Sequence, residues 1–555
     1  MPFSLIWFFC PFLLQTGGTI MQEASTPPEE GVMVDVRSLG AKGDGKTLDT
    51  RVIQRAIDSC GQAGGKVLLA RGSFLCGTLF MRSNVTLEIA EGATLLGSTD
   101  IRDYPSIPAP VPTNADIYHT QSLIAGIDLE NVTLTGRGTI DGQGGTFAPR
   151  PRPKPERYKD RPNGIRLMRC RNVRVENLTM RNSAKWMQHY FACEGVSIRG
   201  ITVDNACNMN NDMIDIDGCR NVTIADCIGD TDDDAITIKS TSDFVTENVT
   251  ITNCVVGSHC NAVKVGTESC GGFRNIAISN VVVRPPKHDR VIFGVRNGLA
   301  GILLTVVDGG ILDGVVIDGV RIDGPRVPIF IRLGNRGRIP NPEGQRPGPG
   351  IVRNVSISNI MAAGADTTGC TIAGLPGHPV EKVELSNFQI TFAGGGTPRG
   401  EDAPVPEKPE EYPESSMFGK LPGYGFNLRH VRDVTIRDLT LRTQSPDARP
   451  AVWAEDAAGL QIRGLWADAP VAGPLMRLDS CSDVTIRESA PCADADEFLA
   501  VRGARSSAIR LLANDLLKVR RAVHAAPGVP PNAIIKANNL EPESKNPKQP
   551  GKVKP

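Results

Sequence analysis

A short strand-like phrase recurs along most of this chain and constrains its fold more than any other feature. It reads RNVRVENLTM from Arg171 and returns as EGVSIRGITV, RNVTIADCIG, ENVTITNCVV and RNIAISNVVV. The first apolar residue of each copy, at positions 173, 196, 222, 249 and 276, recurs at intervals of 23, 26, 27 and 27 residues. Further copies follow as far as Ser482, some of them separated by Gly- and Pro-rich insertions.

Each copy alternates apolar and polar residues with the period of a β-strand and is rich in Val, Ile and Thr. One coil of short strands cannot bury its own apolar face, so successive coils must stack on one another. We therefore predict an all-β fold, a right-handed parallel β-helix that forms one domain over residues 33–530.

The repeat also predicts which side chains stack at the turns. Asn side chains would bond along the ladder at one turn, at positions 172, 221, 248, 275 and 354. The same alignment places Cys227 over Cys254, which favours a pair of interior thiols over a disulfide.

The two ends of the chain differ from the repeat. TLDTRVIQRAIDSC, from Thr47, has helical periodicity and offers Asp49 or Thr50 as the N-cap, which predicts a short helix that caps the open N-terminal coil. Residues 541–555 have the composition of a disordered tail. Residues 1–22 contain a short apolar stretch with no preceding Lys or Arg, and we interpret them as a signal peptide of a secreted or periplasmic protein.

The bulk composition argues against several classes of partner. The formal net charge is +0, so no basic excess indicates a nucleic-acid partner. No later segment looks transmembrane, and the 14 Cys lack the regular pairs of a zinc site. We expect a monomer without a membrane partner, a metal or another cofactor.

An acidic cluster in residues 229–240, GDTDDDAITIKS, interrupts this apolar pattern. Aligning the coils stacks Asp212, Asp234 and Asn261 just before three neighbouring strands, with Asp233 one step earlier. Because neighbouring coils lie about 4.8 Å apart, Asp212, Asp233 and Asp234 would be close together. Strict alternation would point Asp233 and Asp234 to opposite faces, so their convergence requires the chain to turn there.

Three uses of such a cluster stay open from the spacing alone. Glycoside hydrolysis needs one protonated carboxyl and one ionised carboxylate, and mutual repulsion would separate their pKa values. A group of carboxylates also suits Ca²⁺, which polysaccharide lyases with this fold use. The acids could also be solvated residues of a turn.

The sequence resembles glycoside hydrolase family 28, the polygalacturonases and rhamnogalacturonan hydrolases, from about residue 34 to residue 440. The similarity begins with DVRSLGAKGDGKTLDTRVIQRAIDSC, which is typical of pectin-active β-helix enzymes. NNDMIDI at residues 210–216 matches the family's N-T-D-G-I-D-I, and DDAITIKS at residues 233–240 matches D-D-C-I-A-I-K-S. The resemblance implies a pectin-lyase-like solenoid that hydrolyses a pectic polysaccharide.

Carried over to this sequence, the family's motifs imply a role for four residues. Asp233 would be the general acid, and Asp212 and Asp234 would hold and activate the attacking water, with inversion at the anomeric carbon. Asn210 would shape the subsite at the cleaved bond.

Two departures from the family concern the substrate. Asn261 occupies the position of the family histidine, and His259 lies two residues earlier. Residues 301–307, GILLTVV, lack the family's R-I-K motif, which grips the sugar carboxylate. Lys264 lies on the strand face of Asp215 and Thr237 and would replace the missing charge, unless it is a solvated surface lysine.

Other candidates for sugar contacts come from the loops and the preceding coil. Trp186 would stack on a sugar ring or pack against the N-terminal cap. The segment IRLGNRGR at residues 331–338 brings Arg332, Arg336 and Arg338 near an insertion, where binding and surface roles are both open. The Pro- and Arg-rich residues 149–163 would wall a cleft or form a linker.

The favoured function is therefore an inverting hydrolase of a pectic polysaccharide or oligosaccharide. A Ca²⁺-dependent polysaccharide lyase, a non-catalytic glycan-binding solenoid and a hydrolase of an unrelated glycan are the alternatives.

Overall fold

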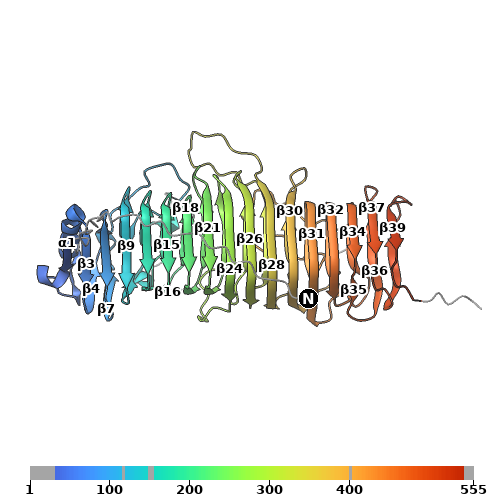
Figure 1. The fold of residues 1–555 in the computed structure, drawn as a ribbon, viewed down its shortest axis with the longest axis horizontal. Helices are drawn as coiled ribbons and strands as arrows, with labels where there is room; N and C mark the ends of the chain where they lie inside the picture. The colour runs from blue at the N-terminus through green and yellow to red at the C-terminus, as the bar shows by residue number, and fades with distance from the viewer. Residues whose placement is uncertain (1–31, 116–118, 148–155, 399–402, 543–555) are drawn as a thin grey trace, which may run out of the picture.

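The computed structural model describes residues 32–115, 119–147, 156–398 and 403–542. The chain stacks coil upon coil into one long parallel β-helix, with helix α1 (Thr50–Ala63) at one end of the rod and β39 (Ile534–Ala537) near the other (Figure 1). Strands of successive coils pair in parallel. The predicted parallel β-helix is confirmed.

The pairings divide the coils into three faces, which we call faces A, B and C. Face A runs through β1 (Val32–Asp35), β3 (Gly65–Leu69), β6 (Val85–Ile89), β9 (Glu130–Gly136), β12 (Arg171–Glu176), β15 (Glu194–Arg199), β18 (Arg220–Ala225), β21 (Thr246–Thr252), β24 (Phe273–Val283), β26 (Ile311–Asp323), β28 (Ile351–Ala365), β30 (Val380–Gly394), β31 (Phe426–Ser445), β32 (Val452–Ala467), β34 (Ser482–Arg487), β37 (Ser507–Leu512) and β39.

Face B runs through β2 (Asp44–Leu48), β4 (Gly72–Cys76), β7 (Ala93–Gly97), β10 (Thr139–Asp141), β13 (Thr179–Arg181), β16 (Thr202–Asn205), β19 (Ile228–Thr231), β22 (Val255–Ser258) and β35 (Ala490–Pro491). The longest strands of face A continue around the corner, so that β24 pairs with both β21 and β22.

Face C runs through β5 (Leu79–Phe80), β8 (Ser122–Ile127), β11 (Asn163–Met168), β14 (Gln188–Phe191), β17 (Ile214–Asp217), β20 (Ile236–Ser240), β23 (Asn261–Ser269), β25 (Ala300–Val306), β27 (Val327–Leu333), β29 (Cys370–Ala373), β33 (Pro474–Asp479), β36 (Ala495–Arg502) and β38 (Val519–Ala525). The first residues of β31 and β32 complete it. Four 3-10 turns complete the described elements, η1 (Val36–Leu39), η2 (Ile101–Asp103), η3 (Gly144–Thr146) and η4 (Glu156–Tyr158).

The core follows directly from the repeat. The marker residues Val173, Val196, Val222, Val249 and Ile276 lie one above another in register and are buried. Full burial of each such side chain contributes about 1.5–3 kcal/mol. The solenoid is therefore held together by rows of identical or similar apolar side chains.

The predicted Asn ladder is present near the start of the face A strands. Asn248 donates its side-chain amide to Asn221 at 3.0 Å, and Asn275 donates to Asn248 at 3.1 Å. Asn172 bonds to Asn131 of the preceding coil, and Asn354 donates to Asp313. All five predicted residues have positive φ, between 52° and 58°. This left-handed conformation costs Asn less than most residues because its side chain bonds locally.

The helix α1 caps the first coil, as the sequence predicts. It buries Ile53, Ala56, Ile57 and Cys60. Asp49 stands at its N-cap position, but the Asp49 carboxylate accepts no bond from the helix. It instead accepts the backbone N–H groups of Lys42 and Gly43, both at 2.8 Å, and so fastens the incoming chain.

Other predictions about the chain have mixed outcomes. Cys227 and Cys254 are buried free thiols, which confirms the thiol pair. Among the described residues, none of the helices is long and apolar enough to cross a bilayer. The predicted signal peptide at residues 1–22 lies outside the described residues, as does most of the predicted tail.

Candidate active site

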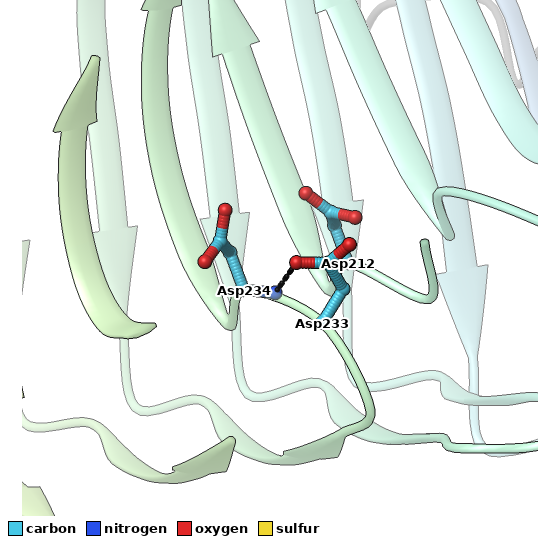
Figure 2. A group of neighbouring side chains, drawn as sticks. All are labelled: Asp212, Asp233 and Asp234. Atoms are coloured by element: carbon cyan, nitrogen blue, oxygen red, sulfur yellow. Dashed lines mark hydrogen bonds between the residues drawn. The ribbon is translucent and has the colours of Figure 1, made fainter. Parts of the chain in front are cut away.

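Three aspartates from two adjacent coils meet at the start of face C. Asp212 precedes β17, and Asp233 and Asp234 precede β20, which pairs in register with β17. One oxygen of each carboxylate lies within 4.8 Å of an oxygen of the others. The side chains are gathered at the beginnings of the two strands (Figure 2). The residues are only 2%, 7% and 2% exposed, respectively.

A turn at residues 232–235 brings two consecutive aspartates to the same place. The chain leaves β19 after Thr231 and re-enters a strand only at Ile236. The hydroxyls of Thr231 and Ser258 both donate to the Asp233 carbonyl, each at 2.6 Å. The Asp233 carboxylate accepts the backbone N–H of Asp234 at 2.9 Å (Figure 2). These bonds break the strict alternation that would have separated the two side chains.

Burial gives Asp212 and Asp233 an elevated proton affinity. Burial raises the pKa of Asp212 well above its usual range, and the charges of Asp215 and Asp233 raise it further. Burial also raises the pKa of Asp233, and the adjacent Asp234 carboxylate adds to the effect. Asp233 accepts a bond from the Asn210 amide at 3.2 Å, whereas Asp212 Oδ1 is buried without a hydrogen-bond partner. The site therefore retains a proton that exposed carboxylates would lose.

Asp234 has a different environment because it is saturated with donors. Its Oδ1 accepts the backbone N–H of Asn261 at 3.1 Å and the Asn261 side-chain amide at 2.7 Å. Its Oδ2 accepts from Lys264 Nζ at 2.7 Å. Lys264 in turn donates to the Tyr412 hydroxyl at 3.0 Å. Asn261 and Lys264, predicted to replace the family residues, are buried and contact Asp234, so their predicted contact with the substrate stays a prediction.

Lys239 lies among the acids on the other side of the group. Its Nζ is 3.4 Å from Asp215, 3.7 Å from Glu268 and 3.9 Å from Asp212. Burial lowers the pKa of a lysine, but these three carboxylates outweigh it, so the pKa of Lys239 is raised. The ammonium also lies 4.6 Å from the centroid of the Trp186 ring. Lys239 is thus a fixed positive charge beside Asp212.

A cavity of about 310 Å³ opens in front of the three aspartates. The chain segments that line it come from distant parts of the sequence, including the connection between β30 and β31. The lining residues are His119, Tyr158, Trp186, Asn210, Asp212, Asp233, Asp234, Lys239, Glu268, Phe293, Arg338, Tyr412 and Glu414.

Residues 77–405, more than half of the chain, match the model of Glycosyl hydrolases family 28. The chain belongs to this family. The family match contains all three aspartates and every residue that lines the cavity except Tyr412 and Glu414, and it ends before the last coils of the solenoid.

Individual relatives agree with the family assignment. The chain is 35% identical over 212 residues to a "Probable polygalacturonase" of Vitis vinifera, covering 36% of this chain and 43% of that protein. It is 37% identical over 120 residues to an "Exo-poly-alpha-D-galacturonosidase" of Dickeya chrysanthemi, covering 20% of each. The matched regions thus span less than half the length of these curated relatives.

A solved structure shares the fold. The exopolygalacturonase of Thermotoga maritima aligns over 74% of this chain and 92% of its own, with a TM-score of 0.57 and 23% identity. At that identity the likeness concerns the β-helix alone.

Four of the predicted sugar-binding residues of this family 28 chain do not line the cavity: His259, Asn261, Lys264 and Arg332. His259 is fully buried, and its Nδ1 faces the carbonyls of Val295 and Arg296 at 3.1 and 3.0 Å. Arg332 is also buried and donates to the carbonyls of Gly374 and Glu407. Both side chains anchor neighbouring segments, so the interpretation of His259 and Arg332 as substrate contacts is corrected. Trp186 and Asn210 do line the cavity.

Trp186 packs on a neighbouring histidine and not on the helical cap, and its contact with a sugar ring stays a prediction. Its ring stacks on His119 with 3.5 Å between centroids, and only 8% of the residue is exposed. The part of it that remains accessible faces the cavity.

Several residues at or near the cavity were not predicted. Two further aspartates of the acidic run, Asp230 and Asp232, hold a neighbouring loop. Asp230 pairs with Arg284, and Asp232 accepts the backbone N–H groups of Ile292 and Phe293. Burial nevertheless raises the pKa of Asp232 to about 7. Lys239 could have been found from its place in DDAITIKS. Tyr412 and Glu414 belong to an insertion that carries no recognisable signal.

Proposed function

We propose that this chain is a polygalacturonase-type hydrolase that cleaves O-glycosidic bonds in a pectic polysaccharide or its oligosaccharides. The observation that carries the proposal is the meeting of three buried aspartates from two coils in one cavity of a family 28 chain. Glycoside hydrolysis requires a protonated carboxyl and an ionised carboxylate side by side. The three aspartates have different surroundings, which suits one of them to hold a proton while another is ionised.

In the proposed reaction Asp233 is the general acid. Its proton passes to the glycosidic oxygen as the bond from that oxygen to the anomeric carbon breaks. A water held between Asp212 and Asp234 attacks the anomeric carbon from the other side and gives its proton to a carboxylate. The unbonded Asp212 Oδ1 leaves Asp212 able to bond to this water, whereas Asp234 already accepts three hydrogen bonds.

The anomeric outcome is a discriminating measurement for this mechanism. The resemblance to family 28 predicts inversion, and inverting enzymes commonly separate their two carboxyl groups by about 6.5–9.5 Å. Here the nearest oxygens of the three groups lie within 4.8 Å of each other. Proton NMR of the first product formed separates inversion from retention.

A Ca²⁺-dependent lyase is less compatible with the charges at the site. The same three carboxylates are close enough to share a cation. However, Lys264 Nζ lies 2.7 Å from Asp234 and Lys239 Nζ lies 3.9 Å from Asp212. Two ammonium groups so close to the carboxylates oppose the binding of a divalent cation.

The test compares Asp233→Asn with Asp226→Asn, a matched substitution at a half-buried residue of the same coil that pairs with Arg199 outside the cavity. Reducing-end release from a panel of pectic polysaccharides should fall by about 10²–10⁴-fold in the first variant and stay unchanged in the second. Activity should survive a chelator, and the products should lack the ultraviolet absorbance of an unsaturated sugar. An unchanged Asp233→Asn variant would refute the mechanism, and activity that disappears with the chelator would favour the lyase.

We also propose that the protein is a secreted or periplasmic monomer. Support for export comes from the apolar stretch within residues 1–22. Sequencing the N-terminus of the exported protein tests for cleavage near residue 22, and light scattering tests for the monomer.

A further inference from the structure

One carboxylate on the wall of the cavity, Glu268, lies among three cations. Glu268 accepts three cations at once: Arg338 at 3.3 Å, Lys239 at 3.7 Å and Arg336 at 3.7 Å. Burial alone would raise the pKa of Glu268, but these cations outweigh it and hold that pKa far below its usual range. The ionised Glu268 carboxylate is thus within 4 Å of three positively charged side chains.

Two of the three cations are satisfied by other protein groups. Arg336 forms a two-point pair with Asp308, which is fully buried. Lys239 has Asp215 and Asp212 within 4 Å, and its side chain is only 5% exposed. Neither cation therefore has much capacity left for a ligand.

Arg338 is the exception. Among the described residues, its guanidinium has one side-chain partner, a single contact from Nη1 to Glu268 Oε1 at 3.3 Å. Its backbone N–H is fixed by Asp308 at 3.0 Å, so the residue is held at the cavity. The side chain is 30% exposed and lines the same cavity as the three aspartates. An arginine has five N–H donors, so most of them remain available to a molecule in the cavity.

The coil that follows Lys264 offers no positively charged side chain for a substrate carboxylate at residues 301–307. Residues 301–307 carry no charge, and Leu303, which pairs in register with Lys264, is fully buried. The available cation at the cavity instead comes from the segment after β27, one coil further along face C.

We propose that Arg338 binds the carboxylate of a uronic acid residue in the substrate and makes the enzyme selective for free over methyl-esterified uronates. The proposal rests on the proposed hydrolysis of a pectic glycan. A planar guanidinium binds a carboxylate through two parallel hydrogen bonds, a geometry that lysine cannot reproduce. A methyl ester has no charge and accepts more weakly, so it would lose this interaction.

The position of Arg338 fits a contact near the cleaved bond. Asp212 neighbours Lys239, Lys239 neighbours Glu268, and Glu268 neighbours Arg338, so a short chain of ion pairs links the guanidinium to the candidate catalytic group. Tyr412, 40% exposed, lies in the same cavity and provides an aromatic face for the sugar ring.

The experiment compares the effect of methyl esterification on the wild type and on Arg338→Gln. In the wild type, esterifying an oligogalacturonate should lower kcat/KM by about 10- to 100-fold, the range expected for the loss of a charge-assisted hydrogen bond. In Arg338→Gln the same esterification should change kcat/KM by less than about 3-fold. Arg338→Lys should retain part of the selectivity. Arg326→Gln, which removes a partly exposed partner of Asp366 outside the cavity lining, is the matched control and should behave as the wild type.

Equal sensitivity to esterification in the wild type and Arg338→Gln would overturn the inference, as would a wild type that ignores esterification. Calorimetric binding of oligogalacturonate to Asp233→Asn, with and without Arg338→Gln, separates this inference from the proposed function. Binding that requires Arg338 in a protein whose wild type cleaves no pectic substrate would refute the hydrolase and keep the uronate site. Cleavage that does not depend on Arg338 would refute the uronate site and keep the hydrolase.

Discussion

The pair between Lys264 and Asp234 makes a strong prediction about stability. Both residues are 2% exposed, and Nζ lies 2.7 Å from Oδ2. At this distance the attraction is about 6 kcal/mol with an effective dielectric constant of about 20, most of which offsets the cost of burying the charges. Removing one partner of a buried pair leaves the other charge uncompensated, which costs about 3–5 kcal/mol.

We therefore expect Lys264→Met to lower the free energy of unfolding by about 3–5 kcal/mol at neutral pH. Adding Asp234→Asn to this variant should recover most of the loss, because no unpaired buried charge remains. The matched control is Lys66→Met, which breaks an exposed lysine–carboxylate pair of nearly the same length, 2.8 Å to Glu88. That substitution should cost less than about 1 kcal/mol.

Scanning calorimetry of the three variants and the wild type tests the order of their melting temperatures. The double variant should lie between Lys264→Met and the wild type, and Lys66→Met should lie close to the wild type. The electrostatic reasoning fails if the double variant melts no higher than Lys264→Met, or if the exposed pair proves as costly to break as the buried one.

Two further predictions concern the pH dependence of stability and the turns. Burial raises the pKa of Glu414 to about 8, Lys264 opposes the rise, and Asp234 and Asp233 add to it. Because this pKa lies above the unfolded value of about 4.3, Glu414 stabilises the fold at low pH and this contribution is lost as the pH rises toward 8. Glu414→Gln should therefore melt higher than the wild type at pH 8, with a difference that disappears near pH 4; a constant difference between these pH values would contradict it. At the Asn ladder, Asn248→Ala should destabilise the protein more than Asn248→Gly by about 1–2 kcal/mol. The reason is that φ is 57° at this position, which strains the backbone of alanine but not that of glycine. Equal losses of stability in denaturant titrations would show that only the ladder hydrogen bonds matter.

The fold was predictable from the sequence because each coil repeats the same local pattern. Marker residues such as Val222 and ladder asparagines such as Asn248 determine which segments stack. The stacking then determines the register of the strands along each face. The neighbourhood of Asp212 and Asp234 follows from the same register.

The rest of the site depends on contacts that a repeat cannot encode. Whether Asp233 joins Asp234 depends on a turn made by hydroxyl bonds from Thr231 and Ser258. The places of Arg332 and Tyr412 depend on how the long connection between β30 and β31 folds back over face C. That connection has no periodicity, so no pattern in the sequence distinguishes the buried Arg332 from the accessible Arg338.

The division of the aspartates between two coils has a consequence for how such an enzyme can change. The separation of Asp212 from Asp234 is set by main-chain pairing between β17 and β20, whereas the place of Asp233 also depends on the turn at residues 232–235. Loops that wall the cavity can therefore lengthen, shorten or be exchanged while the reacting groups keep their separation. Substrate selectivity therefore depends on the loops, whereas the separation of the reacting groups depends on the paired strands. This division makes the scaffold suited to acquiring new substrates by loop grafting.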